Sequence, residues 1–376
     1  MNEFPCIIVL KNTNLIGKSI YWRSILKIIF FKFRLSLVQQ FQGMKKKLTI
    51  SISLLIFSII TCKKDGFDEG DITIPNFNFP KTIVFEDSLS AYNIFQGLAA
   101  NLIPTNDFEL LELNSVLFTD FAYKQRLVKL PSGTKMTRLA GNSIEFPNGT
   151  ILSKTFFYYI DERDSSLGKN IIETRLMIKE DDKWNAASYR WNESQSEAFL
   201  QLSGSSKPIS WLNSLGQNRS TLYKIPNENE CMTCHQSNNS MTHLGPTIQN
   251  LNKTVSRNGA LVNQLSHLQS KNLLENFSVN QVPSMVDYRN LNASISNRGR
   301  AYLALNCAHC HNPKGWDIPA EKDFDFRFET SLQGSGIPSG KDKIRRNMLD
   351  GEMPFIGTTL MDDEGLALIL DYLESL

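Results

Sequence analysis

The pattern Cys-x-x-Cys-His occurs twice in this chain of 376 residues, at 231–235 (CMTCH) and 307–311 (CAHCH), and it restricts the fold more than any other feature. Two thiols at this spacing reach the two vinyl groups on one edge of a porphyrin, and the next residue, a histidine, then lies under the iron. A four-cysteine zinc site, a redox-active dithiol or structural disulfides would explain the cysteine pairs, but not the histidine after each pair. The pattern therefore predicts two covalently attached c-type haems, each with its iron.

Each predicted haem takes two thioether links and one proximal imidazole from its own motif. The residues expected in these roles are Cys231, Cys234 and His235 for the first haem, and Cys307, Cys310 and His311 for the second. Residues 296–306 have the apolar spacing of a helix that enters the second motif, with Gly299 and Tyr302 on one face. The segment 362–376 predicts a final helix that crosses it there, a small residue against an aromatic one.

The sixth ligand of the first haem is less well indicated. The first motif directly follows 224–227 (KIPN), so no ordinary entry helix precedes it. We expect Met285 as the ligand, with a vacant or water-filled position as the alternative. The other candidates are Met241, His243 and His267.

The chain from 83 to 226 is typical of a β-rich domain. Segments rich in β-branched and aromatic residues alternate with turn-forming residues. Strands are expected at 150–160, 171–178, 183–191 and 197–202. Short strands at this spacing predict a β-sandwich or open barrel, and helices follow from about residue 227, including one at 261–274. The predicted fold is α+β: a β-sandwich-like domain (83–226), a first haem segment (227–292) and a cytochrome c-like second haem domain (293–376).

The segment 44–61 resembles a secretory signal peptide. Three lysines precede thirteen uncharged residues, a run well short of the roughly 20 residues that a membrane-spanning helix needs. The stretch 59–62 (IITC) resembles a bacterial lipobox, in which Cys62 is acylated and becomes the first mature residue. Residues 62–82 are polar, contain Gly and Pro, and predict a tether.

The location of the folded part follows from these segments. Residues 1–43 are predicted to be an upstream extension of the reading frame, and if they are translated, their apolar stretch anchors the chain in place of the lipid. In either case we expect the folded part outside the cytoplasm, in the cell envelope, and with the lipid as its anchor the protein is a periplasmic or outer-membrane lipoprotein.

Charge argues against a nucleic-acid partner. Residues 1–61 hold nine Lys or Arg and one acid, so the formal net charge falls from +2 for the whole chain to −6 without them. Proteins that bind nucleic acids concentrate basic residues on one face, whereas this chain mixes both signs.

Segments of the chain resemble a functionally unassigned family of bacterial diheme c-type cytochromes with a β-rich N-terminal domain. The resemblance is carried by 117–123 (LFTDFAY), 155–158 (TFFY), 172–176 (IETRL), 189–192 (YRWN), 225–235, 245–246, 250–252 and 300–313 (RAYLALNCAHCHNP). The C-terminal segment also resembles class I cytochromes c, in which the methionine of a Met-Pro pair is the sixth ligand. This second resemblance implies Met353 as a ligand, with Met348 and Met361 as alternatives that fill the core.

Three functions compete. The first is single-electron transfer between a redox protein partner in the cell envelope and the respiratory chain. The second is a diheme peroxidase or oxidase whose first haem is open to substrate, with His243 or Glu173 in distal proton transfer. In the third, the β domain is a ligand- or partner-binding module, and the haems are an electron outlet for a separate dehydrogenase. The candidate binding face is formed by Trp184, Tyr189, Trp191 and Trp211, although aromatic residues at strand spacing more often form a core. Independently of these functions, Arg345, Arg346 and Trp316 are candidates to hydrogen-bond haem propionates, with solvated surface charge and ordinary packing as the alternatives.

Overall fold

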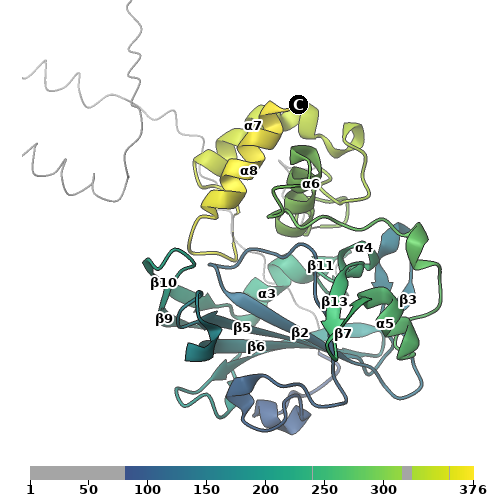
Figure 1. The fold of residues 1–376 in the computed structure, drawn as a ribbon, viewed down its shortest axis with the longest axis vertical. Helices are drawn as coiled ribbons and strands as arrows, with labels where there is room; N and C mark the ends of the chain where they lie inside the picture. Colours follow the sequence, from purple (N-terminus) through teal and green to yellow (C-terminus); the bar gives the residue numbers. More distant parts are fainter. Residues whose placement is uncertain (1–80, 239, 316–323, 355) are drawn as a thin grey trace, which may run out of the picture. The chain divides into compact units, whose positions relative to one another are not determined.

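The computed structural model describes residues 81–376 except 239, 316–323 and 355 (Figure 1). The predicted signal peptide, the lipidation site Cys62 and all but the last two residues of the tether lie outside this part. Within the described residues, no helix is both long and apolar enough to cross a membrane. These residues form a mixed α+β fold with fourteen strands and six α-helices.

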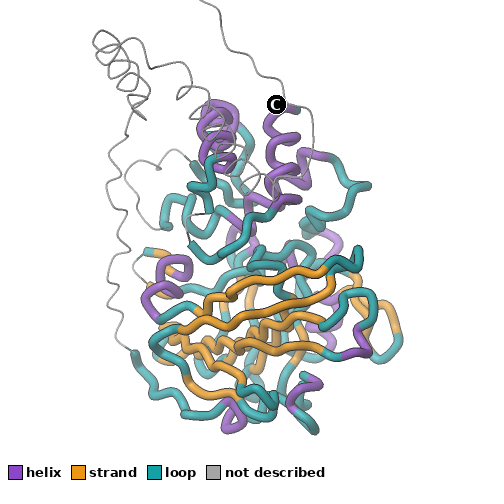
Figure 2. The backbone as a smooth tube through the Cα atoms, turned by 90° about the vertical axis from the view of Figure 1, so that its left-hand side faces the viewer, coloured by secondary structure: helices purple, strands orange, loops and turns teal. Residues whose placement is uncertain are grey.

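The largest element is a six-stranded antiparallel sheet with the order β1-β2-β5-β6-β7-β8, whose strands run side by side in Figure 2. Its strands are β1 (Glu109–Leu110), β2 (Tyr123–Lys129), β5 (Ile151–Tyr159), β6 (Lys169–Glu180), β7 (Lys183–Trp191) and β8 (Ala198–Leu200). Asp181 and Asp182, with φ of 49° and 59°, form the two-residue turn that joins β6 to β7, because such a hairpin needs positive φ at both positions. The sheet therefore confirms the predicted strands to within two residues at most ends.

Smaller strands and the helices surround this sheet. The remaining strands are β3 (Thr137–Arg138), β4 (Ile144–Glu145), β9 (Ser205–Leu212), β10 (Asn218–Ile225), β11 (Gln236–Ser237), β12 (Ser240–Met241), β13 (Thr254–Arg257) and β14 (Ala260–Asn263). The helices are α3 (Glu228–His235), α4 (Ile248–Leu251), α5 (Gln264–Ser270), α6 (Ile295–Asn306), α7 (Ile337–Leu349) and α8 (Asp363–Glu374). The helix predicted at 261–274 is thus shorter, since its first residues belong to the hairpin β13-β14.

The two faces of the large sheet pack differently. Leu127, Leu176 and Tyr189 face a core that includes Phe85 and Leu89 from the segment before β1. On the opposite face, the hairpin β9-β10 packs through a cluster of aromatic and branched side chains, and α3 lies beside β7. The β-rich part therefore has one large sheet covered by short segments, and within the described residues it lacks the second large sheet of the predicted sandwich.

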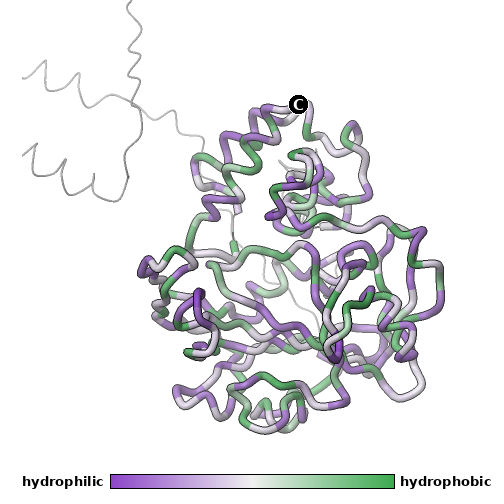
Figure 3. Tube along the Cα trace, in the orientation of Figure 1, coloured by the Kyte–Doolittle hydropathy of each residue, from purple (hydrophilic) through white to green (hydrophobic). Residues whose placement is uncertain are grey.

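The C-terminal helices cross where the sequence predicts. A Cβ atom built on Gly299 of α6 would meet the ring of Tyr372 of α8, and one on Gly365 of α8 would meet the ring of Tyr302 of α6. This reciprocal contact lets the two helices approach closely, because each aromatic ring occupies the space above a glycine. Hydrophilic and hydrophobic segments alternate along α7 and α8 in Figure 3, as expected for helices that bury one side.

Candidate functional site

The first Cys-x-x-Cys-His motif lies within a helix of its own. α3 begins after Asn227, whose side-chain oxygen accepts a hydrogen bond from the Glu230 N–H at 2.9 Å, while the Glu230 carboxylate accepts one from the Asn227 N–H at 2.9 Å. The capping box starts the helix at Glu228, three residues before the motif begins, and so takes the place of a separate entry helix. Cys231 and His235, four residues apart, share one side of α3.

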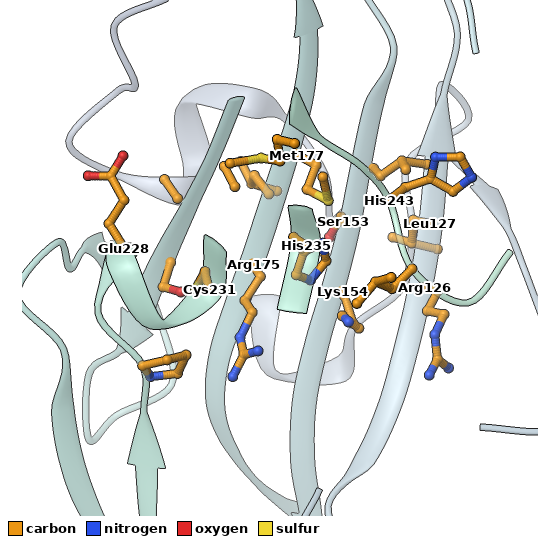
Figure 4. A pocket seen from close by; sticks show the side chains of 18 of the residues that line it. Arg126, Leu127, Ser153, Lys154, Arg175, Met177, Glu228, Cys231, His235 and His243 are labelled. Atoms are coloured by element: carbon orange, nitrogen blue, oxygen red, sulfur yellow. The ribbon is translucent and has the colours of Figure 1, made fainter. Parts of the chain in front are cut away.

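A pocket lies between this side of α3 and the large sheet. It encloses about 830 Å³ of space when its opening to solvent is included. Figure 4 shows Cys231 and His235 above strands β2, β5 and β6, with His243 farther along the same pocket. Met241 also lines this pocket. We call it the first pocket.

The His235 ring is oriented as a metal ligand. Its Nδ1 lies 2.9 Å from the carbonyl oxygen of Thr242, and the Thr242 N–H donates to the His235 carbonyl at 2.6 Å. A carbonyl only accepts, so Nδ1 carries the proton and Nε2 keeps its lone pair. Burial lowers the pKa of His235 to about 3, which keeps the imidazole neutral.

Three basic side chains lie in one row across the sheet. Arg126, Lys154 and Arg175 are direct cross-strand neighbours on β2, β5 and β6, and all three line the first pocket (Figure 4). Arg175 binds both oxygens of the buried Glu173, at 2.9 and 2.5 Å. Among the described residues, no carboxylate lies within ion-pair distance of Arg126 or Lys154. The row therefore holds two cations whose charge Glu173 does not balance.

Burial lowers the pKa of both of these side chains. It lowers the pKa of Arg126 to about 10, and together with the neighbouring Arg175 it lowers the pKa of Lys154 to about 7. Charged groups are rarely buried without a counterion. An anionic ligand with two carboxylates, such as the two propionates of a haem, would neutralise both, so the residues of the first pocket fit this cofactor.

Of the four candidates for the sixth ligand of the first haem, two line the first pocket and two do not. Met285 is buried in the core around α6 and α8, does not line the first pocket, and so is not brought to His235. His267 lies 3.1 Å from the carboxylate of Glu109 and, like Met285, does not line the first pocket. Met241 and His243 do line the pocket, and the His243 ring packs against Phe146 at 4.8 Å between centroids. Burial lowers the pKa of His243 to about 4.

The second motif lies in a larger pocket between α6, α7 and the loop before α8. This second pocket encloses about 1260 Å³, including its opening, and is lined by Cys307, Cys310 and His311. Met353 lines the same pocket as His311, and so do the two alternatives, Met348 and Met361. The His311 ring lies beside Phe324 and Phe326, with centroids 6.1 and 5.2 Å away.

A cluster between the two motifs was missed by the sequence reasoning. The possible ligand atoms of Cys234, His309 and Cys310 all lie within 4.8 Å of one another. Cys234 belongs to the first motif but lines the second pocket. Hydrogen bonds with Cys310, and to a lesser degree with His309, lower the pKa of Cys234. The only sequence signal was the extra histidine inside the second motif.

The remaining predicted site residues have structural surroundings. Glu173 is fully buried and accepts a hydrogen bond from the Tyr223 hydroxyl at 2.8 Å, outside the residues that line the first pocket. The four aromatic residues of the third function belong to cores and do not form one exposed face; they are Trp184, Tyr189, Trp191 and Trp211. Arg345 and Arg346 do not line either pocket, whereas Lys343 lines the second, and Trp316 lies outside the described residues.

Comparison with known proteins adds no relative. A scan against protein-family models, a search of curated proteins and a search of solved structures found no match to this chain. The interpretation of the two pockets therefore depends on the residues of this chain.

Proposed function

We propose that this chain is an exported diheme c-type cytochrome that transfers single electrons. The observation that carries the proposal is the placement of the two motif histidines: His235 and His311 each line a separate pocket, together with at least one cysteine of the same motif. Both pockets are also lined by a thioether or imidazole that could serve as a further ligand: Met241 and His243 in the first, and Met353 in the second.

The residues of each pocket have distinct roles in this proposal. When bound, each haem supplies an iron that accepts and releases one electron. The Thr242 carbonyl holds His235 Nδ1, which leaves Nε2 as the nitrogen that would bind an iron, and Arg126 and Lys154 would balance the charge of the propionates. At the second pocket, His311 and Met353 would hold the iron, and a thioether ligand would stabilise the ferrous state and raise the reduction potential.

A diheme peroxidase or oxidase is the alternative use of the same pockets. It requires a first iron with an open position, and Met285 lies in the core, which leaves Met241 and His243 as the nearby candidates. His243 serves electron transfer if it binds the iron, and proton transfer if it does not. Whether the sixth coordination position of the first iron is occupied or open therefore distinguishes electron transfer from peroxidase or oxidase activity.

A soft-metal site is a second candidate, favoured by the cluster of Cys234, His309 and Cys310. Thiolate and imidazole are the ligands that zinc prefers in structural sites. This use excludes covalent haem at both motifs, because a cysteine in a thioether link has no thiolate to offer. Metal analysis of the purified chain separates these two candidates.

The test is to produce the full chain in a host with a haem-attachment system and to measure covalent haem per chain and its ferric EPR spectrum. We expect two haems, reduced to one in a Cys231→Ala/Cys234→Ala variant and in a Cys307→Ala/Cys310→Ala variant. Two low-spin signals would support electron transfer, and a high-spin signal would support the peroxidase or oxidase. A folded product that contains zinc and no haem would refute the cytochrome proposal.

The place of the protein in the cell is a further part of the proposal. Acylated Cys62 would tether it to a membrane of the cell envelope, where a redox protein or a dehydrogenase exchanges electrons with it. We expect a labelled fatty acid to be incorporated into the full chain and not into a Cys62→Ala variant. Equal labelling of both would refute lipidation at this residue.

A further inference from the structure

We propose that Cys234, His309 and Cys310 bring the two haem sites together, so that the two haems form one coupled pair. This inference rests on the proposed function, since it concerns the same two attachment motifs. It goes further by assigning a task to the cluster that lies between them, which neither motif predicts by itself.

The first step of the argument is the orientation of α3. Cys231 and His235 line the first pocket, whereas Cys234 lines the second pocket beside Cys307 and Cys310. The helix therefore presents one attachment cysteine to each pocket. A haem linked to both cysteines of this motif has the edge that carries its vinyl groups at the boundary of the two pockets.

The second step is the distance between the two attachment sulfurs. The Sγ atoms of Cys234 and Cys310 lie within 4.8 Å of each other, and a ring nitrogen of His309 lies within the same distance of both. These sulfurs would each carry a thioether bond to a different porphyrin. At this distance the two attachment sulfurs are close enough that no other side chain is needed between them to connect the two haems.

The third step is that the backbone holds the two motifs in this arrangement. The Asn238 N–H donates to the carbonyl of Lys314 at 3.1 Å, and these two residues each lie three positions after the histidine of their motif. The side chain of Asn306, just before the second motif, accepts a hydrogen bond from the Phe118 N–H at 2.7 Å. Phe118 in turn lies close to the start of β2, so the second motif is connected to the sheet that forms the first pocket.

The consequence is direct exchange of one electron between the two sites. The exchange oxidises one haem from ferrous to ferric and reduces the other from ferric to ferrous, and no atom or proton is transferred. A partner at either pocket would then have access to both haems. Because a charge at one site acts on the other across a short distance in a protein interior, the two reduction potentials should also depend on each other.

The contact between the motifs can be tested without haem. In the full chain produced without haem attachment, a Cys231→Ala/Cys307→Ala variant retains Cys234 and Cys310. Under mild oxidation we expect a peptide that links these two residues, identified by mass spectrometry. A matched Cys234→Ala/Cys307→Ala variant retains Cys231 and Cys310, which line different pockets, and should lack a linked peptide. Equal linking in both variants, or none in the first, would overturn the proposed contact.

The coupling is tested in the loaded protein. We expect the ferric EPR spectrum of the diheme chain to differ from the sum of the spectra of the two single-haem variants, and each haem to shift in potential when the other is removed. Additive spectra and unchanged potentials, in a chain shown to carry two haems, would overturn the coupling and leave the cytochrome proposal intact. Failure to incorporate haem would overturn both.

Discussion

Gly299→Ala is expected to destabilise the helix pair that forms one side of the second pocket. The new methyl carbon would lie 2.6 and 2.7 Å from Cδ1 and Cβ of Tyr372, closer than the 3.5–4.0 Å or so of an ordinary carbon contact. Tyr372 is fully buried, so its ring has no free space to move into. The helices α6 and α8 must therefore separate by roughly 1 Å.

Two opposing contributions determine the size of the effect. Overpacking of a buried site costs about 1–3 kcal/mol. Replacing glycine with alanine inside a helix gains about 1 kcal/mol in helix propensity. We expect the packing cost to be the larger, because the contact is with a ring held between helices, and predict a net loss of up to about 2 kcal/mol in the free energy of unfolding.

Urea unfolding of the full chain, followed by circular dichroism, measures this loss as a lower midpoint. Asn297→Ala is the matched control, since Asn297 is exposed in the same helix and its replacement raises helix propensity without a new contact. Adding Tyr372→Leu to Gly299→Ala should recover part of the loss by making room for the methyl group. A Gly299→Ala protein as stable as its parent would refute the proposed crossing.

Three further predictions concern the sheet and the pockets. Tyr223→Phe removes a hydrogen bond to the buried Glu173 and should lower the free energy of unfolding by about 1–3 kcal/mol, whereas an unchanged urea midpoint would contradict the buried contact. In the chain without haem, burial holds the pKa of Lys154 at about 7 against an ordinary 10.5, so the folded state binds fewer protons than the unfolded state between these values. Stability should therefore rise as the pH increases above 7, and Lys154→Met should reduce this rise when urea midpoints at neutral and alkaline pH are compared; equal slopes would show that Lys154 is not responsible. In the loaded protein, Met353→Ala should lower the reduction potential of one haem in a potentiometric titration, and an unchanged potential would transfer the ligand role to another residue.

The sequence predicted those parts of the fold that depend on local pattern. Segments rich in β-branched and aromatic residues, separated by turn-forming residues, located β5, β6 and β7. The glycine at position 299 with an aromatic residue at 302 indicated the crossing of α6 with the last helix. The overall layering was harder to predict. One strongly twisted sheet covered by short segments and a two-sheet sandwich share the same alternation of buried positions, so the period of two does not distinguish them.

Spacing along the chain was a poor guide to the sixth ligand of the first haem. Met285 was favoured for its separation from His235, but the segment that carries it runs back across α4, where the Met285 N–H donates to the carbonyl of Gln249 at 3.0 Å. Met241 and His243 reach the first pocket because the chain turns back directly after α3, pairing Gln236 with Met241 in the short hairpin β11-β12. A turn of this kind depends on a few residues, and helical or strand periodicity does not reveal it.

The approach of the two motifs depends on contacts that no single segment contains. Each motif specifies its own cysteines and histidine, and α3 places Cys231 and His235 on one side by helical geometry alone. Helical geometry does not determine what Cys234 contacts. In the structure it lies beside the second motif, which begins more than seventy positions later in the chain. The hydrogen bond between Asn238 and Lys314 brings these segments together, and it joins two backbone groups whose residue types carry no such information. For this reason the cysteine pattern predicts two haem sites, while only the folded chain shows that Cys234 of one motif and Cys310 of the other have their sulfur atoms within 4.8 Å of each other.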